Sequence, residues 1–465
     1  MDSASLSPEL VSEFSDHYSR NNFAEAGKIA LAATKISPNE PIGWKMLGAV
    51  LVQMGRLDES LVPMELAARL APNDAEAQDN LGAVQLQLGQ ITEAVVSHEK
   101  AIALQPSNAV SYCNLGNAFW LQGQHQAAEE NFKKSISLAP DNAGAHHNLA
   151  CLLHHLGRLE QAEDLYTKAI ELAPENATSA LGRWEVRFDK GDFENALKDA
   201  ESVNTEALRA CALETLFALG RDDEVQSRLV EQGAKDSRNL RVAAFSSFFS
   251  AQTKRKVPNH FCEDPLECLY LTNIAHHIKR PTEFISELLE ELSNFRVIWE
   301  PSGKATKGGF QTPASTNLFK EPSGSIRKLN DLVRLEIENY AKNFEHKAIG
   351  FIQDWPSEAH LSAWCVSLQQ QGYQKPHIHP EGWLSGVVYL KVAPSRGDDE
   401  GAIEFGLSGQ RYSGPELPTI IHKPAPGDVV LFPSSLHHKT IPFTTATERV
   451  IVSFDLIPRR SPVEG

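Results

Sequence analysis

The sequence lacks long apolar runs, a secretion signal and an excess of basic residues. No hydrophobic stretch approaches the roughly 20 residues that a membrane-spanning helix needs. The opening residues, Met1 to Leu6, contain neither the basic region nor the apolar core of a signal peptide, so we expect a cytoplasmic protein without a membrane segment. The formal net charge of −16 argues against nucleic acid or an anionic membrane surface as the main partner.

Paired cysteine motifs are absent as well. The six cysteines are scattered, and no two have Cys-x-x-Cys spacing, so we expect free thiols in a reducing compartment and no disulfide framework. The content of 42 % hydrophobic and 22 % charged residues is typical of a soluble globular protein. At 465 residues the chain is too long for one ordinary core, which favours two or three domains.

A 34-residue repeat dominates the N-terminal half. Proline, glycine and alanine recur at fixed phases, which suits a helical hairpin with a glycine turn, and a proline opening the next unit. The pattern resembles the tetratricopeptide repeat, with Asn21 in place of the turn glycine of the first unit. The phased prolines are Pro38, Pro72, Pro106, Pro140 and Pro174, and the phased glycines are Gly55, Gly89, Gly123, Gly157 and Gly191.

Such hairpins cannot bury their apolar faces alone, so they stack into an α-solenoid with a concave groove. We expect this solenoid over residues 4–202. From 203 to 283 the helical pattern continues but the period is lost, which indicates an irregular helical cap and connector. Because the groove of such an array usually holds a peptide, the expected partner is a protein or peptide.

The C-terminal part, residues 284–460, changes to short strands behind two helices. Many short strands separated by Pro and Gly turns, with flanking helices, favour a double-stranded β-helix of the jelly-roll type. The whole chain is thus expected to be a multidomain α + β protein. The helices are expected at 285–294 and 326–343, and the strands at 361–368, 385–392, 402–405, 428–432 and 449–455.

Three histidines in this part have the spacing of a metal site. His377 and His379 are two residues apart, so on a strand they point to the same face. His438, on a distant strand, can close a mononuclear non-haem iron centre with open positions. Its neighbour His437 is expected to point the other way. Arg449 follows in a terminal strand, and its guanidinium suits a dicarboxylate because it pairs bidentately and keeps its charge.

The motifs occur in an order that resembles the 2-oxoglutarate- and Fe(II)-dependent oxygenases, and more narrowly the branch often carried behind tetratricopeptide repeats. The resemblance covers roughly residues 284–459. It implies Fe(II), with 2-oxoglutarate and O₂ as co-substrates, and release of succinate and CO₂ as a C–H bond is hydroxylated. It also implies His377 and His438 as ligands, Arg449 as the partner of the far carboxylate of 2-oxoglutarate, and Tyr389 as a hydrogen-bonding neighbour. The motifs are His377 to Pro380, Trp383 to Leu390, Gly401 to Gly406, Pro426 to Ser434, His438 and Arg449.

Position 379 departs from the wider superfamily, whose second ligand is the acid of a His-x-Asp or His-x-Glu pair. Three arrangements are open. His379 is the third ligand, in a site with one negative charge fewer than the two-His-one-carboxylate triad. Alternatively, His379 and Glu381 form a literal His-x-Glu pair of ligands, and His377 lies next to the ligands without binding the metal. In the third arrangement two histidines suffice, and His379 orients substrate or water. We take His377, His379 and His438 as the expected ligands.

The expected function is that of an Fe(II)- and 2-oxoglutarate-dependent dioxygenase that hydroxylates a protein or peptide presented by the repeat groove. No catalytic residue is expected beyond the metal site. One alternative is a repeat scaffold whose barrel is inactive. Another is a three-His iron dioxygenase that acts on a small molecule without 2-oxoglutarate, for which Arg449 would be dispensable.

Overall fold

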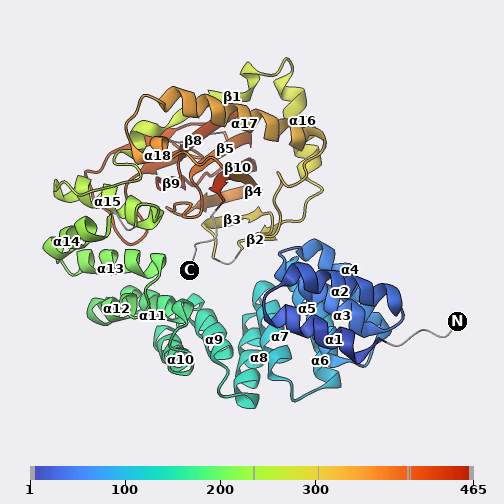
Figure 1. The fold of residues 1–465 in the computed structure, drawn as a ribbon. Coiled ribbons are helices and arrows are strands. Elements are labelled where there is room, and N and C mark those ends of the chain that lie inside the picture. Colours follow the sequence, from blue (N-terminus) through green and yellow to red (C-terminus); the bar gives the residue numbers. More distant parts are fainter. Residues whose placement is uncertain (1–5, 234–235, 302, 395–396, 398, 460–465) are drawn as a thin grey trace. The chain divides into compact units, whose positions relative to one another are not determined.

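The computed structural model describes residues 6–233, 236–301, 303–394, 397 and 399–459, and it shows two compact units (Figure 1). The first extends to Val186 and the second begins at Arg187. In the described part of the chain, no helix has both the length and the apolar character needed to cross a bilayer. All six cysteines are free thiols, as predicted.

The first unit consists of antiparallel helical hairpins, which confirms the predicted repeat solenoid. The phased glycines make the hairpins possible: Gly89 and Gly123 adopt φ of +74° and +76°, a conformation that favours glycine. Asn21, with φ of +58°, replaces glycine in the first unit as predicted. The helices are α1 (Pro8–Ser19), α2 (Phe23–Ile36), α3 (Pro41–Gln53), α4 (Leu57–Leu70), α5 (Ala75–Gln87), α6 (Ile91–Leu104), α7 (Ala109–Leu121), α8 (His125–Leu138), α9 (Ala143–His155), α10 (Leu159–Leu172) and α11 (Ala177–Asp189), which runs into the second unit.

Glycines also sit where the two helices of a hairpin approach each other. A Cβ on Gly116 would lie 2.7 Å from the ring of Phe132, and a Cβ on Gly82 would lie 2.7 Å from the ring of His98. Both rings are fully buried. Small residues at this phase of the repeat therefore let each hairpin close over one large ring.

The second unit begins with the helices α12 (Phe193–Ala200), α13 (Glu206–Ala218), α14 (Asp222–Gly233) and α15 (Leu240–Thr253). Helix α15 is buried along most of its length. Its Phe245 and Phe248 pack on Tyr412, which comes from the strand-rich part of the unit, with ring centroids 5.2 and 4.6 Å apart. Its Leu240 and Ala243 belong to the same hydrophobic cluster as the sheet residues.

Two antiparallel sheets form the rest of the unit. The larger has the order β1-β8-β5-β10-β4-β3-β2, and the smaller β7-β6-β9. Helices α16 (Pro281–Leu292) and α17 (Gly324–Phe344) share the hydrophobic core with one face of the larger sheet (Figure 1). The strands are β1 (Tyr270–Asn273), β2 (Ile298–Trp299), β3 (Thr306–Gln311), β4 (Ala359–Gln374), β5 (Leu384–Lys391), β6 (Ile403–Gly406), β7 (Thr419–His422), β8 (Asp428–Pro433), β9 (His437–Thr440) and β10 (Arg449–Pro458). The short helices are η1 (Pro265–Cys268), η2 (Ile274–His276) and α18 (Gly350–Gln353).

Strand β10 lies inside the larger sheet and pairs with β5 on one side and β4 on the other. Its side chains alternate between the two faces, as the pleat requires. Val450, Val452 and Phe454 point into the hydrophobic core, whereas Arg449, Ile451 and Ser453 line a cavity on the opposite face. One strand thus joins the core to the functional face of the unit.

The predicted fold class is confirmed as an N-terminal helical repeat followed by a C-terminal antiparallel sheet structure, and the two sheets are compatible with a jelly roll. All five expected strands are present. The segment 306–311, for which no strand was predicted, is strand β3 paired with β4. Strand β1 lies within 203–283 and pairs with β8. The domain boundaries 4–202, 203–283 and 284–460 stay predictions.

A chain that begins at Phe284 should be markedly less stable than one that begins at Arg187. It lacks β1, which leaves the backbone groups of β8 unpaired, and it exposes Tyr412. Each large apolar side chain left in water costs about 1.5–3 kcal/mol. Thermal unfolding of the two truncated chains would measure the difference in stability, and binding of a dye specific for apolar surface would measure the exposed core. Equal melting temperatures would contradict the prediction.

Candidate metal centre

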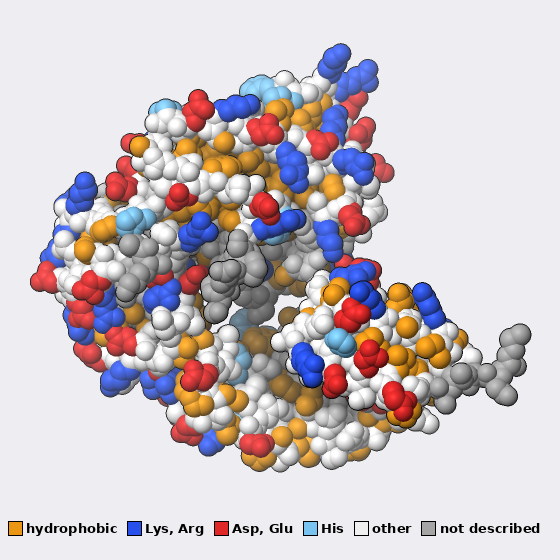
Figure 2. Space-filling model, in the orientation of Figure 1, with side chains coloured by type: hydrophobic (Ala, Val, Ile, Leu, Met, Phe, Trp, Pro, Cys, Tyr) orange, Lys and Arg blue, Asp and Glu red, His pale blue; other side chains and the backbone are white. Residues whose placement is uncertain are grey.

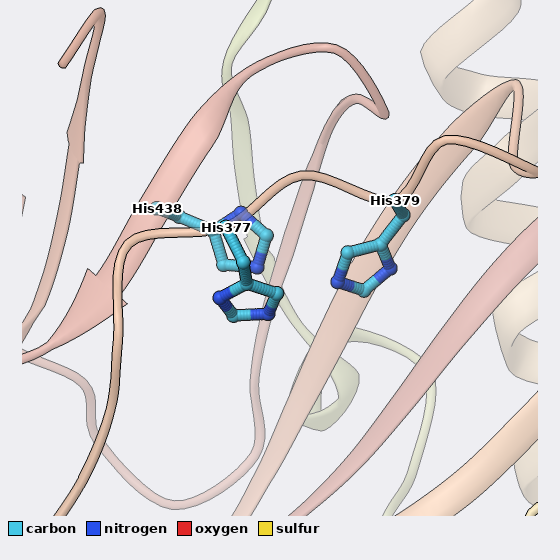
Figure 3. A group of neighbouring side chains, drawn as sticks. All are labelled: His377, His379 and His438. Atoms are coloured by element: carbon cyan, nitrogen blue, oxygen red, sulfur yellow. The ribbon is translucent and has the colours of Figure 1, made fainter. Parts of the chain in front are cut away.

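The histidines predicted to form a metal site lie together on the cavity face (Figure 3). His377 and His379 come from the segment between β4 and β5, and His438 is the second residue of β9. His377 and His438 exchange two backbone hydrogen bonds of 3.1 Å, and the His379 amide donates to the Ser434 carbonyl at 3.0 Å. One potential ligand atom of each histidine lies within 4.8 Å of those of the other two.

Backbone carbonyls define the tautomers of two of these rings. The Nδ1 atom of His377 lies 2.7 Å from the carbonyl oxygen of Lys375, and that of His438 lies 3.2 Å from the carbonyl oxygen of Leu436. A carbonyl oxygen only accepts, so each Nδ1 carries the proton and donates it. The lone pair of each ring is therefore on Nε2, the nitrogen left to bind a metal.

The third ring is held by a carboxylate. The Nδ1 atom of His379 lies 2.6 Å from Oδ1 of Asp455, on β10. The ring thus has the same tautomer as the other two, with Nε2 free to ligate. Sequence reasoning missed Asp455. The signal was an acidic residue in an apolar strand, six positions after Arg449 and hence on the same face.

Burial keeps the rings of His377 and His438 neutral. Burial is the larger cause and the neighbouring His379 the next, and together they lower the pKa of His377 to about 3. Burial and the rings of His377 and His379 hold the pKa of His438 well below its usual value. Neutral imidazole is the form that binds metals, so these two rings are ready donors at neutral pH.

Arg449 lies in the same cavity and is 1 % exposed. Among the residues that the structure describes, no acceptor of ordinary hydrogen-bond geometry reaches its Nε or Nη1. Its guanidinium carbon lies 5.0 Å from the ring centroid of the buried Tyr389, whose hydroxyl also lacks a hydrogen-bond partner there. Burial lowers the pKa of Arg449, and the Tyr389 hydroxyl offsets part of that effect.

An unpaired buried cation is costly, so Arg449 and Tyr389 have the chemistry of an anion site facing the three imidazoles. The cavity is narrow and mixed in character. It is lined by Trp364, Gln374, His377, His379, Gly386, Val387, Tyr389, Ile403, Phe432, His438, Arg449, Ile451 and Ser453.

Three further residues of this domain, Glu381, His422 and Trp383, lie outside the histidine cluster. Glu381 is exposed in the turn before β5. His422 bonds to Asp428, with 3.1 Å between Nε2 and Oδ2. Trp383 belongs to the core, where its indole donates to the Phe351 carbonyl.

His437 points away from the cluster, as predicted. Its Nε2 lies 2.7 Å from the hydroxyl of Tyr412, the residue that packs on α15. Burial lowers the pKa of His437 to about 4. The adjacent residues His437 and His438 therefore face opposite sides of β9, one toward the helices and the other toward the cavity.

Three family models match the parts of the chain that the motifs indicate. Residues 362–455 match the family described as "Putative 2OG-Fe(II) oxygenase". Residues 107–175 and 86–123 match two models of the tetratricopeptide repeat. The chain therefore carries tetratricopeptide repeats and, over residues 362–455, a C-terminal domain that matches the family of putative 2OG-Fe(II) oxygenases.

No curated protein matches the chain. Similar solved structures include MamA from Desulfovibrio magneticus RS-1, with 23 % identity over 36 % of this chain and 94 % of MamA, at a TM-score of 0.33. PilF of Pseudomonas aeruginosa has 17 % identity over 45 % of this chain and 97 % of its own, at 0.39. A tetratricopeptide repeat protein from Parabacteroides merdae has 20 % identity over 48 % and 90 %, at 0.38.

The buried histidine on the helix side predicts a pH effect on the metal-free protein. Because the pKa of His437 is about 4 when folded and near 6.5 when unfolded, the unfolded chain takes up the proton first as the pH falls. Its contribution to stability is complete above pH 6.5 and is lost as the pH falls toward 4, by at most about 1.4 kcal/mol per pH unit.

His437→Gln, which keeps a hydrogen-bonding group for Tyr412 but does not titrate, should have a shallower slope of unfolding free energy against pH. Urea unfolding from pH 7.5 to 4.5 with a chelator present would measure it. Parallel curves for the variant and the wild type would show that His437 is not the group responsible.

Proposed function

We propose that the C-terminal domain is an Fe(II)- and 2-oxoglutarate-dependent dioxygenase that hydroxylates a protein or peptide bound by the repeats. One observation carries the proposal: three imidazoles converge in a cavity that also contains a buried guanidinium, to which the described residues offer no anionic partner. The first group suits a divalent transition metal, and the second suits a carboxylate. A dicarboxylate co-substrate can use both.

The donor set fits Fe(II). His377, His379 and His438 would hold the ion through Nε2, and three protein ligands leave positions for co-substrate and O₂. The bound iron would supply the oxidative decarboxylation of 2-oxoglutarate to succinate and CO₂, coupled to hydroxylation of a C–H bond. The placement of Glu381 in an exposed turn favours His379 over Glu381 as the third ligand.

The chain's own residues would bind and enclose the co-substrate. Arg449 would pair with its far carboxylate through its guanidinium, and Tyr389 would donate its hydroxyl to the same group. Phe432, Ile451 and Trp364 line the cavity beside the histidines and would keep water from the reacting atoms.

The repeats supply the argument for a polypeptide substrate. Tetratricopeptide arrays generally bind other proteins, as solenoid grooves do. Large apolar side chains are exposed on these helices, where orange atoms gather in Figure 2, and they include Val62, Val96 and Val110 with 58, 61 and 53 % exposure. A small-molecule substrate would leave this surface without a role.

The ligand assignment predicts which substitutions release the metal. His377→Ala and His438→Ala should abolish stoichiometric Fe(II) binding with the fold intact. His379→Asp should retain the ion, because it restores the commoner ligand set, and Glu381→Ala should bind as tightly as the wild type. Anaerobic titration with metal analysis would measure this, and His422→Ala is the matched control outside the cavity. Loss of iron in Glu381→Ala, with retention in His379→Ala, would reverse the assignment.

The co-substrate assignment separates binding from stability. Arg449→Leu should lower 2-oxoglutarate affinity at least about 100-fold, since truncating a buried charge pair costs about 3–5 kcal/mol. The same change should not lower the melting temperature of the metal-free protein, because it removes a buried charge without a partner.

The visible absorption that develops when anaerobic Fe(II) protein binds 2-oxoglutarate would report the affinity. Lys391→Met, which removes a positive charge from the exposed end of β5, is the control and should bind normally. Unchanged affinity in Arg449→Leu would place the co-substrate elsewhere. A wild-type protein that binds Fe(II) but no 2-oxoglutarate would favour the dioxygenase that needs none.

A further inference from the structure

His379 differs from the other two histidines in the group that accepts its Nδ1 proton. The acceptors for His377 and His438 are neutral backbone carbonyls, whereas His379 donates to the carboxylate of Asp455. Asp455 is 7 % exposed. In the described part of the chain, no lysine or arginine forms an ion pair with Asp455. The group at ion-pair distance from its carboxylate is the His379 ring.

Hydroxyl groups hold this carboxylate in place. Ser385 donates its hydroxyl to Asp455 Oδ1 at 2.6 Å, and the hydroxyls of Ser385 and Ser434 lie 2.8 Å apart. Both serines are buried. Since the carbonyl of Ser434 also accepts the amide of His379, the histidine is held by its ring and its backbone through one connected network.

Strand register builds the network. Asp455 stands opposite Ser385 on β5 in the antiparallel pairing. Cross-strand partners of this kind have Cβ atoms within about 5.5 Å, so the carboxylate of one residue can accept a hydrogen bond directly from the hydroxyl of the other. Arg449 and Asp455 are six residues apart on one strand and therefore on one face, with the three imidazoles on that same face.

We propose that Asp455 is the positioning residue of the metal centre, and that through His379 it supplies the negative charge which a directly bound carboxylate supplies in the commoner His-x-Asp or His-x-Glu arrangement. The proposal rests on the proposed function, since it assumes a divalent metal at the histidines. Asp455 is not counted among the ligands, because it lies outside the group of His377, His379 and His438 whose ligand atoms converge, and its Oδ1 bonds to His379 and Ser385.

The charges favour this role. A divalent ion, three neutral imidazoles, a doubly negative co-substrate and the cation of Arg449 together leave one uncompensated positive charge in a buried cavity. Burying a net charge is costly. A carboxylate ligand would cancel this charge at the metal, and Asp455 would cancel it from behind the His379 ligand. The hydrogen bond from His379 to Asp455 also makes the imidazole a stronger donor to the metal and fixes the orientation of the ring.

The test compares metal affinity in full-length variants. Asp455→Asn keeps an oxygen that can accept from His379 but removes the charge, and we expect about 10–100-fold weaker binding of Fe(II) and Co(II), with altered visible bands of the Co(II) protein. Asp428→Asn is the matched control, because Asp428 bonds His422 in the same domain but outside the cavity, and it should bind as the wild type does.

A double-mutant cycle separates electrostatics from packing. In the His379→Asp background the carboxylate is already at the metal, so adding Asp455→Asn should change affinity less than threefold. An equal loss in both backgrounds would show a structural effect only and overturn the proposal, as would a folded Asp455→Asn protein with wild-type affinity and Co(II) bands. If Asp455→Asn does not fold, Asp455→Ser serves in the same cycle with the same criteria.

Failure of the positioning role can be distinguished from failure of the proposed function. A wild-type protein that binds Co(II) and Fe(II) but not 2-oxoglutarate would refute the dioxygenase while the loss in Asp455→Asn still supported the positioning role. A wild-type protein that binds neither metal would refute both.

Discussion

The register of strand β10 is the constraint on which the C-terminal unit depends. The strand is hydrogen-bonded on both sides, and its two faces carry opposite kinds of residue. Val450, Val452 and Phe454 fill the core, whereas Arg449 lines the cavity and Asp455, on the same face of the strand, contacts His379. A shift by one residue would exchange the faces, placing charges in the core and aliphatic groups at the histidines. Hydrophobic burial thus selects the register that also assembles the site.

Burial of the two charged side chains on this strand, Arg449 and Asp455, costs free energy. Among the described residues, Arg449 has no anionic partner, and the Asp455 carboxylate bonds to the His379 ring and the Ser385 hydroxyl and not to a lysine or arginine. Isolated charges of this kind destabilise a fold, and they persist where the rest of the structure overdetermines their positions. The core beneath β10 and the helices α16 and α17 provide that excess stability. A ligand that brings the complementary charges would relieve both.

Much of this could be predicted from the sequence, for identifiable reasons. The repeat was readable because glycines and prolines return every 34 residues, and Asn21 adopts the positive φ that its place in the pattern required. The histidine cluster was readable from spacing and order. Asp455 was not, because its partner lies 76 residues away and the contact depends on strand pairing. Strand β3 was missed because its glycines weaken any strand pattern, although they allow its close approach to β4.

The centre also joins two parts that backbone hydrogen bonds hold to different extents. Asp455 and Arg449 belong to a strand enclosed by neighbours, whose amide protons should exchange with solvent only through large openings. His377 and His379 belong to a connecting segment that meets the sheets through a single bridge and a few further backbone bonds. Deuterium uptake should therefore slow mainly in that connecting segment when an ion binds, and hardly at all in β10. Strand β10 would thus keep its conformation when the ion binds, and the connecting segment would become more ordered.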